Sequence, residues 1–235
     1  MAETTLICLP FSGAGASFFR GWQAGAPAGC TILPVQLPGR EERFVEPLLA
    51  DVGLAVDDVW RRLHTDLPGG TRVALFGHSL GAVLAYELAH RLTGEREVAG
   101  LFVSGSPDPW NGRTECATGL ADDEFVARVE SFAGYTHPAL ADAEVRELVL
   151  PLLRADVEMH ENYRPSRAEP LGVPVTVFRG RDDELVTPED SAGWRRATTA
   201  RFETAELDGG HMYLTEHPGA LLALIGARLE PARTR

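Results

Sequence analysis

Short apolar runs recur along this chain between segments that have the spacing of helices. The first run, Leu6-Ile7-Cys8-Leu9-Pro10, leads into a glycine-rich turn. We predict strands at residues 6–10, 31–35, 72–76, 98–104, 173–179 and 201–206. Because these runs are continuously apolar rather than alternating, they indicate a parallel sheet that is buried on both faces.

The segments between the runs carry apolar residues three or four positions apart, as amphipathic helices do. Val52, Val56, Val59 and Leu63 form one such set. We predict helices within residues 47–63, at 80–92, after a cap at Thr187, and at 218–229. The alternation of strand and helix predicts an α/β fold with a mostly parallel central sheet and helices on both faces.

The alternation is interrupted between about residues 110 and 170, where no strand is predicted. An apolar stripe with helical spacing lies there, although Pro151 interrupts it. The stripe is formed by Val145, Leu148, Val149, Leu152, Leu153 and Val157. We therefore predict a helical lid at residues 110–170, inserted in a core formed by residues 1–109 and 171–235.

Length and charge limit the classes of protein to which the chain can belong. With 235 residues, 44% of them hydrophobic, it can bury one substantial core. Its formal net charge is −12 and it has no long run of basic residues. A protein that binds nucleic acid by neutralising phosphates would show the opposite balance, so we expect no nucleic-acid partner.

The N-terminus and the cysteines indicate the compartment. Residues 1–5 lack the positive charge of a secretory signal, and no stretch approaches the ~20 apolar residues of a membrane span. Cys8, Cys30 and Cys116 form no CxxC pair, so they indicate neither a disulfide framework nor a zinc site. We expect a cytoplasmic protein that has reduced, mostly buried thiols and does not bind membranes.

The segment Gly77-His78-Ser79-Leu80-Gly81 matches the pattern G-x-S-x-G between a predicted strand and a predicted helix. The glycines permit a sharp turn, so that the Ser79 hydroxyl projects from the edge of the sheet at the start of a helix. Backbone N–H groups in this position can stabilise a developing oxyanion. The pattern predicts a nucleophilic serine, and the alternative interpretation is a helix-capping serine in a tight turn.

A serine nucleophile requires a histidine base and an orienting carboxylate, which follow it in the chain order Ser, Asp or Glu, His. His211 follows two glycines in the loop after the last predicted strand, from which it can reach Ser79. Other histidines fit less well, because His217 begins the last helix and His78 adjoins the serine. The remaining four lie in predicted helices or in the lid: His64, His90, His137 and His160.

The carboxylate is expected in the loop after the strand at residues 173–179. Asp182, Asp183 and Glu184 are the candidates there. We choose Asp183, because the turn pattern Asp-x-x-Val would return Val186 to the core and leave Asp182 as a solvated turn residue. Asp182 stays open as the alternative.

Two backbone N–H groups are expected to form an oxyanion hole, one from Leu80 and one from Phe11 in the loop after the first strand. Small residues in that loop let the backbone approach a substrate. Gly13 and Gly15 also match part of a dinucleotide-binding pattern. We reject that interpretation because the third glycine is missing and the second strand ends at Gln36, where an acidic residue would be expected.

Nearly the whole chain resembles the type II thioesterases, which are α/β-hydrolases that serve polyketide synthases and nonribosomal peptide synthetases. The resemblance is carried by residues 9–16, 36–41, 76–82, 86–89, 180–186 and 209–211. This chain departs from the family at Leu80, where Met is frequent, and at Ala14, where a second glycine is frequent. Neither departure removes a candidate catalytic side chain.

The resemblance implies an α/β-hydrolase fold and hydrolysis of acyl thioesters on the phosphopantetheine arm of an acyl carrier protein or peptidyl carrier protein. Ser79, Asp183 and His211 would act through an acyl-Ser79 intermediate, without metal or cofactor. The enzyme would be a monomer that binds its carrier transiently and clears aberrant or stalled acyl groups. Two alternatives stay open: a carboxylesterase or lipase with the same triad, and a non-catalytic ligand-binding protein.

Overall fold

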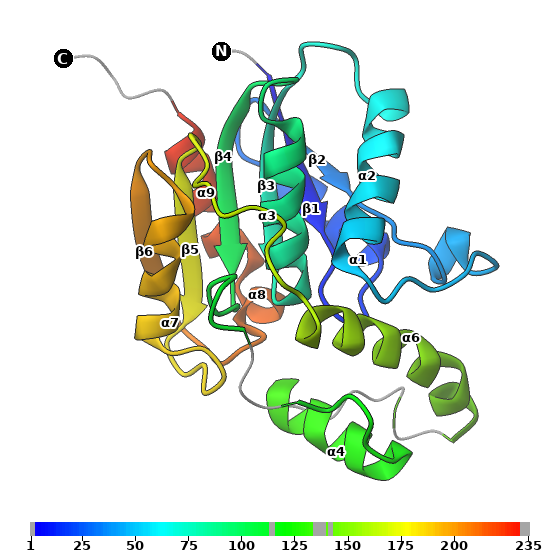
Figure 1. The fold of residues 1–235 in the computed structure, drawn as a ribbon. Coiled ribbons are helices and arrows are strands. Elements are labelled where there is room, and N and C mark those ends of the chain that lie inside the picture. Colours follow the sequence, from blue (N-terminus) through cyan, green and yellow to red (C-terminus); the bar gives the residue numbers. More distant parts are fainter. Residues whose placement is uncertain (1–2, 113–115, 134–139, 141–142, 231–235) are drawn as a thin grey trace.

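A parallel sheet forms the centre of the computed structural model, which describes residues 3–112, 116–133, 140 and 143–230 (Figure 1). The strands follow the order β2-β1-β3-β4-β5-β6, and every neighbouring pair is parallel. They are β1 (Thr4–Leu9), β2 (Cys30–Pro34), β3 (Arg72–His78), β4 (Val98–Ser104), β5 (Val175–Gly180) and β6 (Phe202–Leu207). The parallel sheet predicted from the apolar runs is thus confirmed.

The strands lie within two residues of their predicted bounds. One extension affects the site directly, because β3 continues past Phe76 to His78. Its pairing with β4 runs as far as His78 and Ser104. The turn of the serine motif therefore starts only at Ser79, directly at the carboxyl end of the sheet.

Helices cover both faces of this sheet (Figure 1). Apolar side chains of α2 and α3 pack on one face, and those of α1, α8 and α9 pack on the other. These helices are α1 (Ala16–Arg20), α2 (Val52–Asp66), α3 (Leu80–Leu92), α8 (Tyr213–Glu216) and α9 (Pro218–Leu229). The structure also contains α7 (Pro188–Gly193) and the 3-10 helices η1 (Gly21–Gly25), η2 (Glu41–Arg43) and η3 (Trp194–Ala197).

Alternate residues of each strand face two separate apolar layers. Ile7 and Leu9 of β1 pack in the layer under α2 and α3, whereas Leu6 and Cys8 pack in the layer under α1, α8 and α9. All four side chains are at most 1% exposed. Because both faces of the strand are covered, both sets of positions are apolar, which explains the continuous runs in the sequence.

Two helices beyond the carboxyl ends of the strands form the described part of the expected lid: α4 (Asp122–Ala133) and α6 (Ala143–Glu161) (Figure 1). The described residues between 110 and 170 contain no strand, as predicted. The interruption predicted at Pro151 is absent, and α6 continues through this residue. The apolar packing of α6 outweighs the backbone hydrogen bond that proline cannot donate. The apolar cluster that includes residues of α4 and α6 contains Ala117, Phe125, Val126, Leu140, Leu150, Leu153 and Val157.

Buried carboxylates attach both ends of this segment to the core. Asp108, which is 1% exposed, accepts a hydrogen bond from the backbone N–H of Trp110 at 3.0 Å. Glu87 of α3, which is 6% exposed, accepts hydrogen bonds from the Tyr163 hydroxyl at 2.7 Å and the Ser166 N–H at 2.9 Å. Both ends of the predicted lid segment, residues 110–170, are therefore hydrogen-bonded to buried carboxylates of the core.

Several helix bounds differ from the predictions for local reasons. The helix predicted within 47–63 begins at Val52, because Asp51 caps it by accepting from the N–H of Leu54 at 2.8 Å. Thr187 caps α7 as predicted, within a capping box. The helices α1 and α8 were not predicted, because they have only five and four residues, too few for an apolar period to show. The helix α4 lies within the segment predicted to be helical.

The cysteines differ from the prediction in their exposure. Cys8 is buried, but Cys30 is half-buried and Cys116 is exposed, so the prediction of mostly buried thiols is wrong. Burial is the main cause that raises the pKa of Cys8 and of Cys30 above the usual range. In the described part of the chain, no helix combines the length and the apolar character needed to cross a membrane.

The crossing of β3 and α3 leaves no room for side chains at the two motif glycines. A Cβ on Gly77 would lie 1.8 Å from the carbonyl oxygen of Gly81. A Cβ on Gly81 would lie 2.5 Å from the carbonyl oxygen of Leu9 in β1. Both obstacles are backbone atoms of the central sheet and of the helix packed on it, so neither can move without disturbing the core.

We therefore expect the substitution Gly77→Ala to destabilise the protein by about 3 kcal/mol, the upper range for overpacking. The matched control is Gly219→Ala in α9, where a Cβ would meet nothing within 4 Å. This control should stabilise the protein by about 0.5–1 kcal/mol, because alanine favours the helix. Urea unfolding midpoints measure both changes, and a Gly77→Ala midpoint equal to that of the wild type would contradict the expectation.

Candidate active site

Ser79 occupies a strained position between β3 and α3. Its backbone has φ 53° and ψ −118°, a conformation that residues with a side chain rarely adopt. Its N–H donates to the carbonyl oxygen of Ser104 at the end of β4, at 2.8 Å. The residue is 6% exposed. This is the local geometry expected of a serine whose hydroxyl must stand clear of the sheet.

Asp183 and His211 form a buried pair near this serine. His211 Nδ1 lies 2.9 Å from Asp183 Oδ2, and the two side chains are 7% and 0% exposed. With Nδ1 facing the carboxylate as a donor, Nε2 is left as the acceptor that a general base needs. Asp182 is exposed, so the structure brings Asp183, and not the alternative carboxylate, to the histidine.

The loop that carries Asp183 is held in shape by its own backbone. Asp183 Oδ1 accepts from the N–H groups of Leu185 at 2.9 Å and Val186 at 3.2 Å. Val186 returns to the core at 1% exposure, as the turn pattern predicts. The second carboxylate oxygen is thereby left free for the imidazole, and the aspartate has little freedom to rotate away from it.

Arg179, at the end of β5, also holds this loop in place through hydrogen bonds to its backbone. Its guanidinium donates to the carbonyl oxygens of Arg181, Asp183 and Val186 at 3.1, 2.9 and 2.5 Å. Its charge is paired with Glu206 of β6 at 2.8 Å. This role of Arg179 was not predicted from the sequence, although an arginine at the end of an otherwise apolar strand was an available signal.

The histidine next to the serine has a supporting position. His78 Nδ1 lies 2.9 Å from Ser104 Oγ, which lies 2.6 Å from the hydroxyl of Tyr213. Burial raises the pKa of Tyr213 above its usual value, so this hydroxyl stays neutral at physiological pH. The His78 ring packs against His211 with the ring centroids 4.7 Å apart. His78 therefore points into the core and supports the ring of His211.

The end of β4 connects Ser79 and His211. Ser104 accepts from the N–H of Ser79, and the next residue, Gly105, lies directly under the imidazole. A Cβ on Gly105 would lie 3.1 Å from Cε1 of His211. The serine and the histidine thus contact consecutive residues of one strand end, although 132 positions separate them in the sequence.

The remaining histidines lie elsewhere, in accordance with the prediction. His64 is in α2, where Nδ1 lies 2.9 Å from the carbonyl oxygen of Trp60. His90 is in α3, and burial lowers its pKa. His160 is in α6 and His217 precedes α9, whereas His137 lies outside the described residues.

The two expected oxyanion donors belong to segments that lie side by side. Leu80 is the first residue of α3, and Gly81 packs on the carbonyl groups of Leu9 and Pro10. Phe11 follows directly, and its ring lies edge-on to His78 with the centroids 5.9 Å apart. The backbone of Phe11 is thereby brought beside the serine turn, as a second donor would have to be.

A largely apolar cavity of about 580 Å³ opens beside this site. One wall is the loop after β1, from Phe11 to Gly15, and the opposite wall comes from the lid segment. The lid residues in this wall are Val129, Glu130, Leu140, Val149, Leu152 and Leu153. Met212, the neighbour of His211, also lines the cavity, which therefore runs from the histidine loop to the underside of α6.

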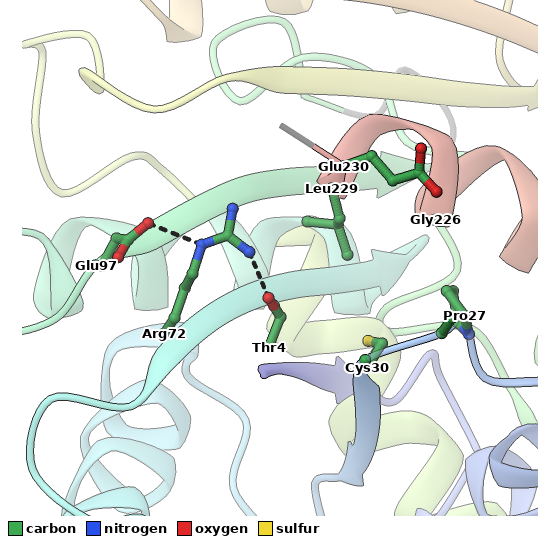
Figure 2. A pocket seen from close by; sticks show the side chains of 10 residues that line it. Thr4, Pro27, Cys30, Arg72, Glu97, Gly226, Leu229 and Glu230 are labelled. Carbon is green, nitrogen blue, oxygen red and sulfur yellow. Dashed lines mark hydrogen bonds and ion pairs between the residues drawn. The ribbon is translucent and has the colours of Figure 1, made fainter. Parts of the chain in front are cut away.

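A second cavity, of about 320 Å³, lies at the opposite end of the sheet (Figure 2). Thr4, Cys30 and Arg72, which line it, are the first residues of their strands. Arg72 is paired with Glu97 at 2.8 Å and donates to the Thr4 hydroxyl, so the polar groups there satisfy one another. This cavity lacks the hydroxyl, imidazole and carboxylate set, and the site at the carboxyl edge is the candidate for chemistry.

These groups together can perform covalent acyl transfer. A serine hydroxyl, an imidazole oriented by a carboxylate and backbone donors at a helix start are the parts that such chemistry uses. Among the described residues, no group of three His, Cys, Asp or Glu side chains is placed to hold a metal ion.

Comparison with known proteins identifies the family. The profile of the thioesterase domain family matches residues 4–229. The "probable cadicidin biosynthesis thioesterase" of Streptomyces griseus is 36% identical over 232 residues, which cover 97% of this chain and 63% of that protein. This chain thus spans less than two thirds of the length of that relative.

Solved structures agree with the family assignment. The RedJ thioesterase from the prodiginine pathway of Streptomyces coelicolor is 34% identical, with a TM-score of 0.89 over 97% of this chain and 91% of RedJ. The type II thioesterase BorB from the borrelidin cluster is 35% identical, with a TM-score of 0.87 over 97% of this chain and 93% of BorB. The chain belongs to the thioesterase family, and it is a type II thioesterase of the α/β-hydrolase superfamily.

Proposed function

We propose that this enzyme hydrolyses acyl thioesters on the phosphopantetheine arm of acyl or peptidyl carrier proteins, with Ser79, His211 and Asp183 as nucleophile, base and orienting acid. The observation that carries the proposal is the buried contact between Asp183 and His211 beside the strained Ser79. A serine that only caps a helix would not need a strained backbone, and it would not need a buried histidine and carboxylate pair nearby. Family membership supports a thioester as the bond that is cleaved.

The first half of the reaction transfers the acyl group to the enzyme. His211 Nε2 accepts the proton of the Ser79 hydroxyl while Oγ attacks the thioester carbonyl carbon. The carbonyl oxygen becomes an oxyanion, which the N–H groups of Leu80 and Phe11 stabilise. The carbon–sulfur bond then breaks, His211 returns the proton to the leaving sulfur, and the carrier departs with its free thiol.

The second half releases the product. His211 accepts a proton from water, and the resulting hydroxide equivalent attacks the ester carbonyl of acyl-Ser79. The ester bond breaks, His211 returns the proton to Ser79 Oγ, and a carboxylic acid leaves. Asp183 stabilises the imidazolium in both halves. All of these steps use side chains and backbone groups only, so the proposal includes no metal and no organic cofactor.

The proposed role is to clear aberrant or stalled acyl groups from a biosynthetic assembly line. The names of two relatives support a role in biosynthesis, because they place RedJ in the prodiginine biosynthetic pathway and BorB in the borrelidin biosynthetic cluster. The segment 110–170 would act as a lid, and the apolar cavity under α6 would hold the acyl chain. We propose that the protein is a cytoplasmic monomer, in keeping with three free cysteines and a transient carrier contact.

We expect the substitution Ser79→Ala to lower the turnover of acyl-pantetheine thioesters by about 10⁶-fold, as in other serine hydrolases that lose a triad member. The measurement is hydrolysis of a series of acyl-pantetheines and matched oxyesters by the wild type and the variant. Faster turnover of the oxyesters would assign the protein to the carboxylesterases. No Ser79-dependent turnover of either series, with a loaded carrier protein included, would favour a ligand-binding protein.

Neighbouring aspartates provide a matched test of the acid. Asp183→Asn should lower kcat by about 10⁴-fold, because an amide favours the wrong tautomer of His211. Asp182→Asn removes one carboxylate from the same loop at an exposed position and should leave kcat within about threefold of the wild type. Equal kcat values for the two variants would remove Asp183 from the triad.

A further inference from the structure

A fully buried carboxylate on the lid helix contacts the loop that carries the proposed oxyanion donor. Asp156 of α6 is 0% exposed. Its Oδ2 accepts from the backbone N–H of Gly13 at 2.8 Å and from Arg40 Nη1 at 2.8 Å, and its Oδ1 accepts from Arg40 Nη2 at 2.7 Å. The lid helix is therefore hydrogen-bonded to the core by a charged group as well as packed on it.

Arg40 also forms a hydrogen bond with the loop that contains Gly13. It is 4% exposed, and its Nη1 also donates to the carbonyl oxygen of Ala14 at 3.0 Å. The ion pair thus contacts two consecutive residues. Asp156 accepts a hydrogen bond from the N–H of Gly13, and Arg40 donates one to the carbonyl oxygen of Ala14. Both charged groups are buried, so water does not compete for these hydrogen bonds.

The residues that the pair holds belong to the turn that begins at Phe11. The N–H of Ala14 donates to the carbonyl oxygen of Phe11 at 2.9 Å, and Gly13 has φ 80°, which closes a tight turn from Phe11 to Ala14. Leu153 of α6 lies against the same turn, 3.4 Å from where a Cβ on Gly13 would be. The orientation of the Phe11 peptide is therefore coupled to the position of α6.

We propose that Asp156 and Arg40 are positioning residues that make the lid helix a support of the oxyanion hole. By binding Gly13 and Ala14, they hold the Phe11 N–H in the direction of the acyl oxygen. This inference rests on the proposed function of Ser79 and Phe11. The positioning role explains why a buried ion pair attaches α6 to the core here, although an apolar contact would pack the helix at a lower desolvation cost.

The arrangement links acyl binding to acyl cleavage. An acyl chain in the cavity contacts Leu153 and Val149 on the inner face of α6, and the next turn of the same helix carries Asp156. If α6 is displaced, Gly13 loses its acceptor and the turn loses its support. Oxyanion stabilisation is then complete only when the lid helix is seated, which suppresses cleavage before the substrate is enclosed.

The test compares Asp156→Asn and the double variant Arg40→Met/Asp156→Leu with Glu87→Gln. The double variant replaces the buried charges together, so it avoids the unpaired buried charge that destabilises a single variant. Glu87 is the matched control, since it is a buried carboxylate that anchors the chain just beyond the C-terminal end of α6 through Tyr163 and Ser166. In the described part of the chain, its hydrogen bonds go to Tyr163 and Ser166 and not to the turn at Gly13, so its loss weakens the lid without touching the oxyanion donor.

The readouts are kcat and KM for an acyl-pantetheine, and the inhibition constant of an acyl trifluoromethyl ketone, whose adduct with a serine carries an oxyanion. We expect the Asp156 variants to lose about 10- to 100-fold in kcat with little change in KM, which approaches the loss of one oxyanion donor. Their affinity for the ketone should fall in parallel. Glu87→Gln should keep both values within about threefold, even if its melting temperature falls equally.

Each other outcome decides against the inference. An equal loss of kcat in Glu87→Gln would mean that the pair only stabilises the lid. A lower kcat with unchanged ketone affinity would mean that the oxyanion hole is intact. Wild-type kinetics in the folded double variant would remove any positioning role. Failure of the proposed function is recognised separately, because turnover would then survive in Ser79→Ala.

Discussion

The positive φ of Ser79 is the constraint on which the site depends. A residue with a side chain adopts such a backbone at a cost of about 1–3 kcal/mol, and it keeps it only where the surroundings allow no other conformation. Here the surroundings are the pairing of β3 with β4, the hydrogen bond from Ser79 to Ser104, and two glycines packed directly on backbone. The well-packed sheet thus holds a residue whose local preference opposes the fold.

Charged side chains in the interior then fix the loops around this serine. Arg179 ties the loop of Asp183 to the end of β5, and the pair of Arg40 with Asp156 ties the turn at Gly13 to α6. Loops have few apolar contacts of their own, so their shape must come from hydrogen bonds to groups that cannot move. In this protein the sheet positions Ser79, and buried ions hold the loops that carry its proposed partners.

The sequence was informative where the signal was local. Ser79 and His211 stand in short patterns next to predicted strand ends, and the turn pattern was sufficient to prefer Asp183 over Asp182, which the structure leaves exposed. Asp156 could not be found in this way, because 143 positions separate it from Gly13. An aspartate within an amphipathic helix is ordinarily a solvated residue, and only the tertiary contact reveals its neighbours.

The sheet was predictable for the same reason, since most of its strands are largely apolar runs, whereas the small helices were not. Much of the wall of the proposed acyl cavity belongs to the segment 110–170, through residues such as Val149 and Leu152, and the groups proposed for chemistry belong to the core. Under the proposed function, acyl selectivity and reactivity are therefore encoded in different stretches of the sequence. Substitutions in this wall would change which acyl groups fit and leave the proposed triad untouched, whereas Asp156 belongs to the same helix and contacts the loop of the proposed oxyanion donor.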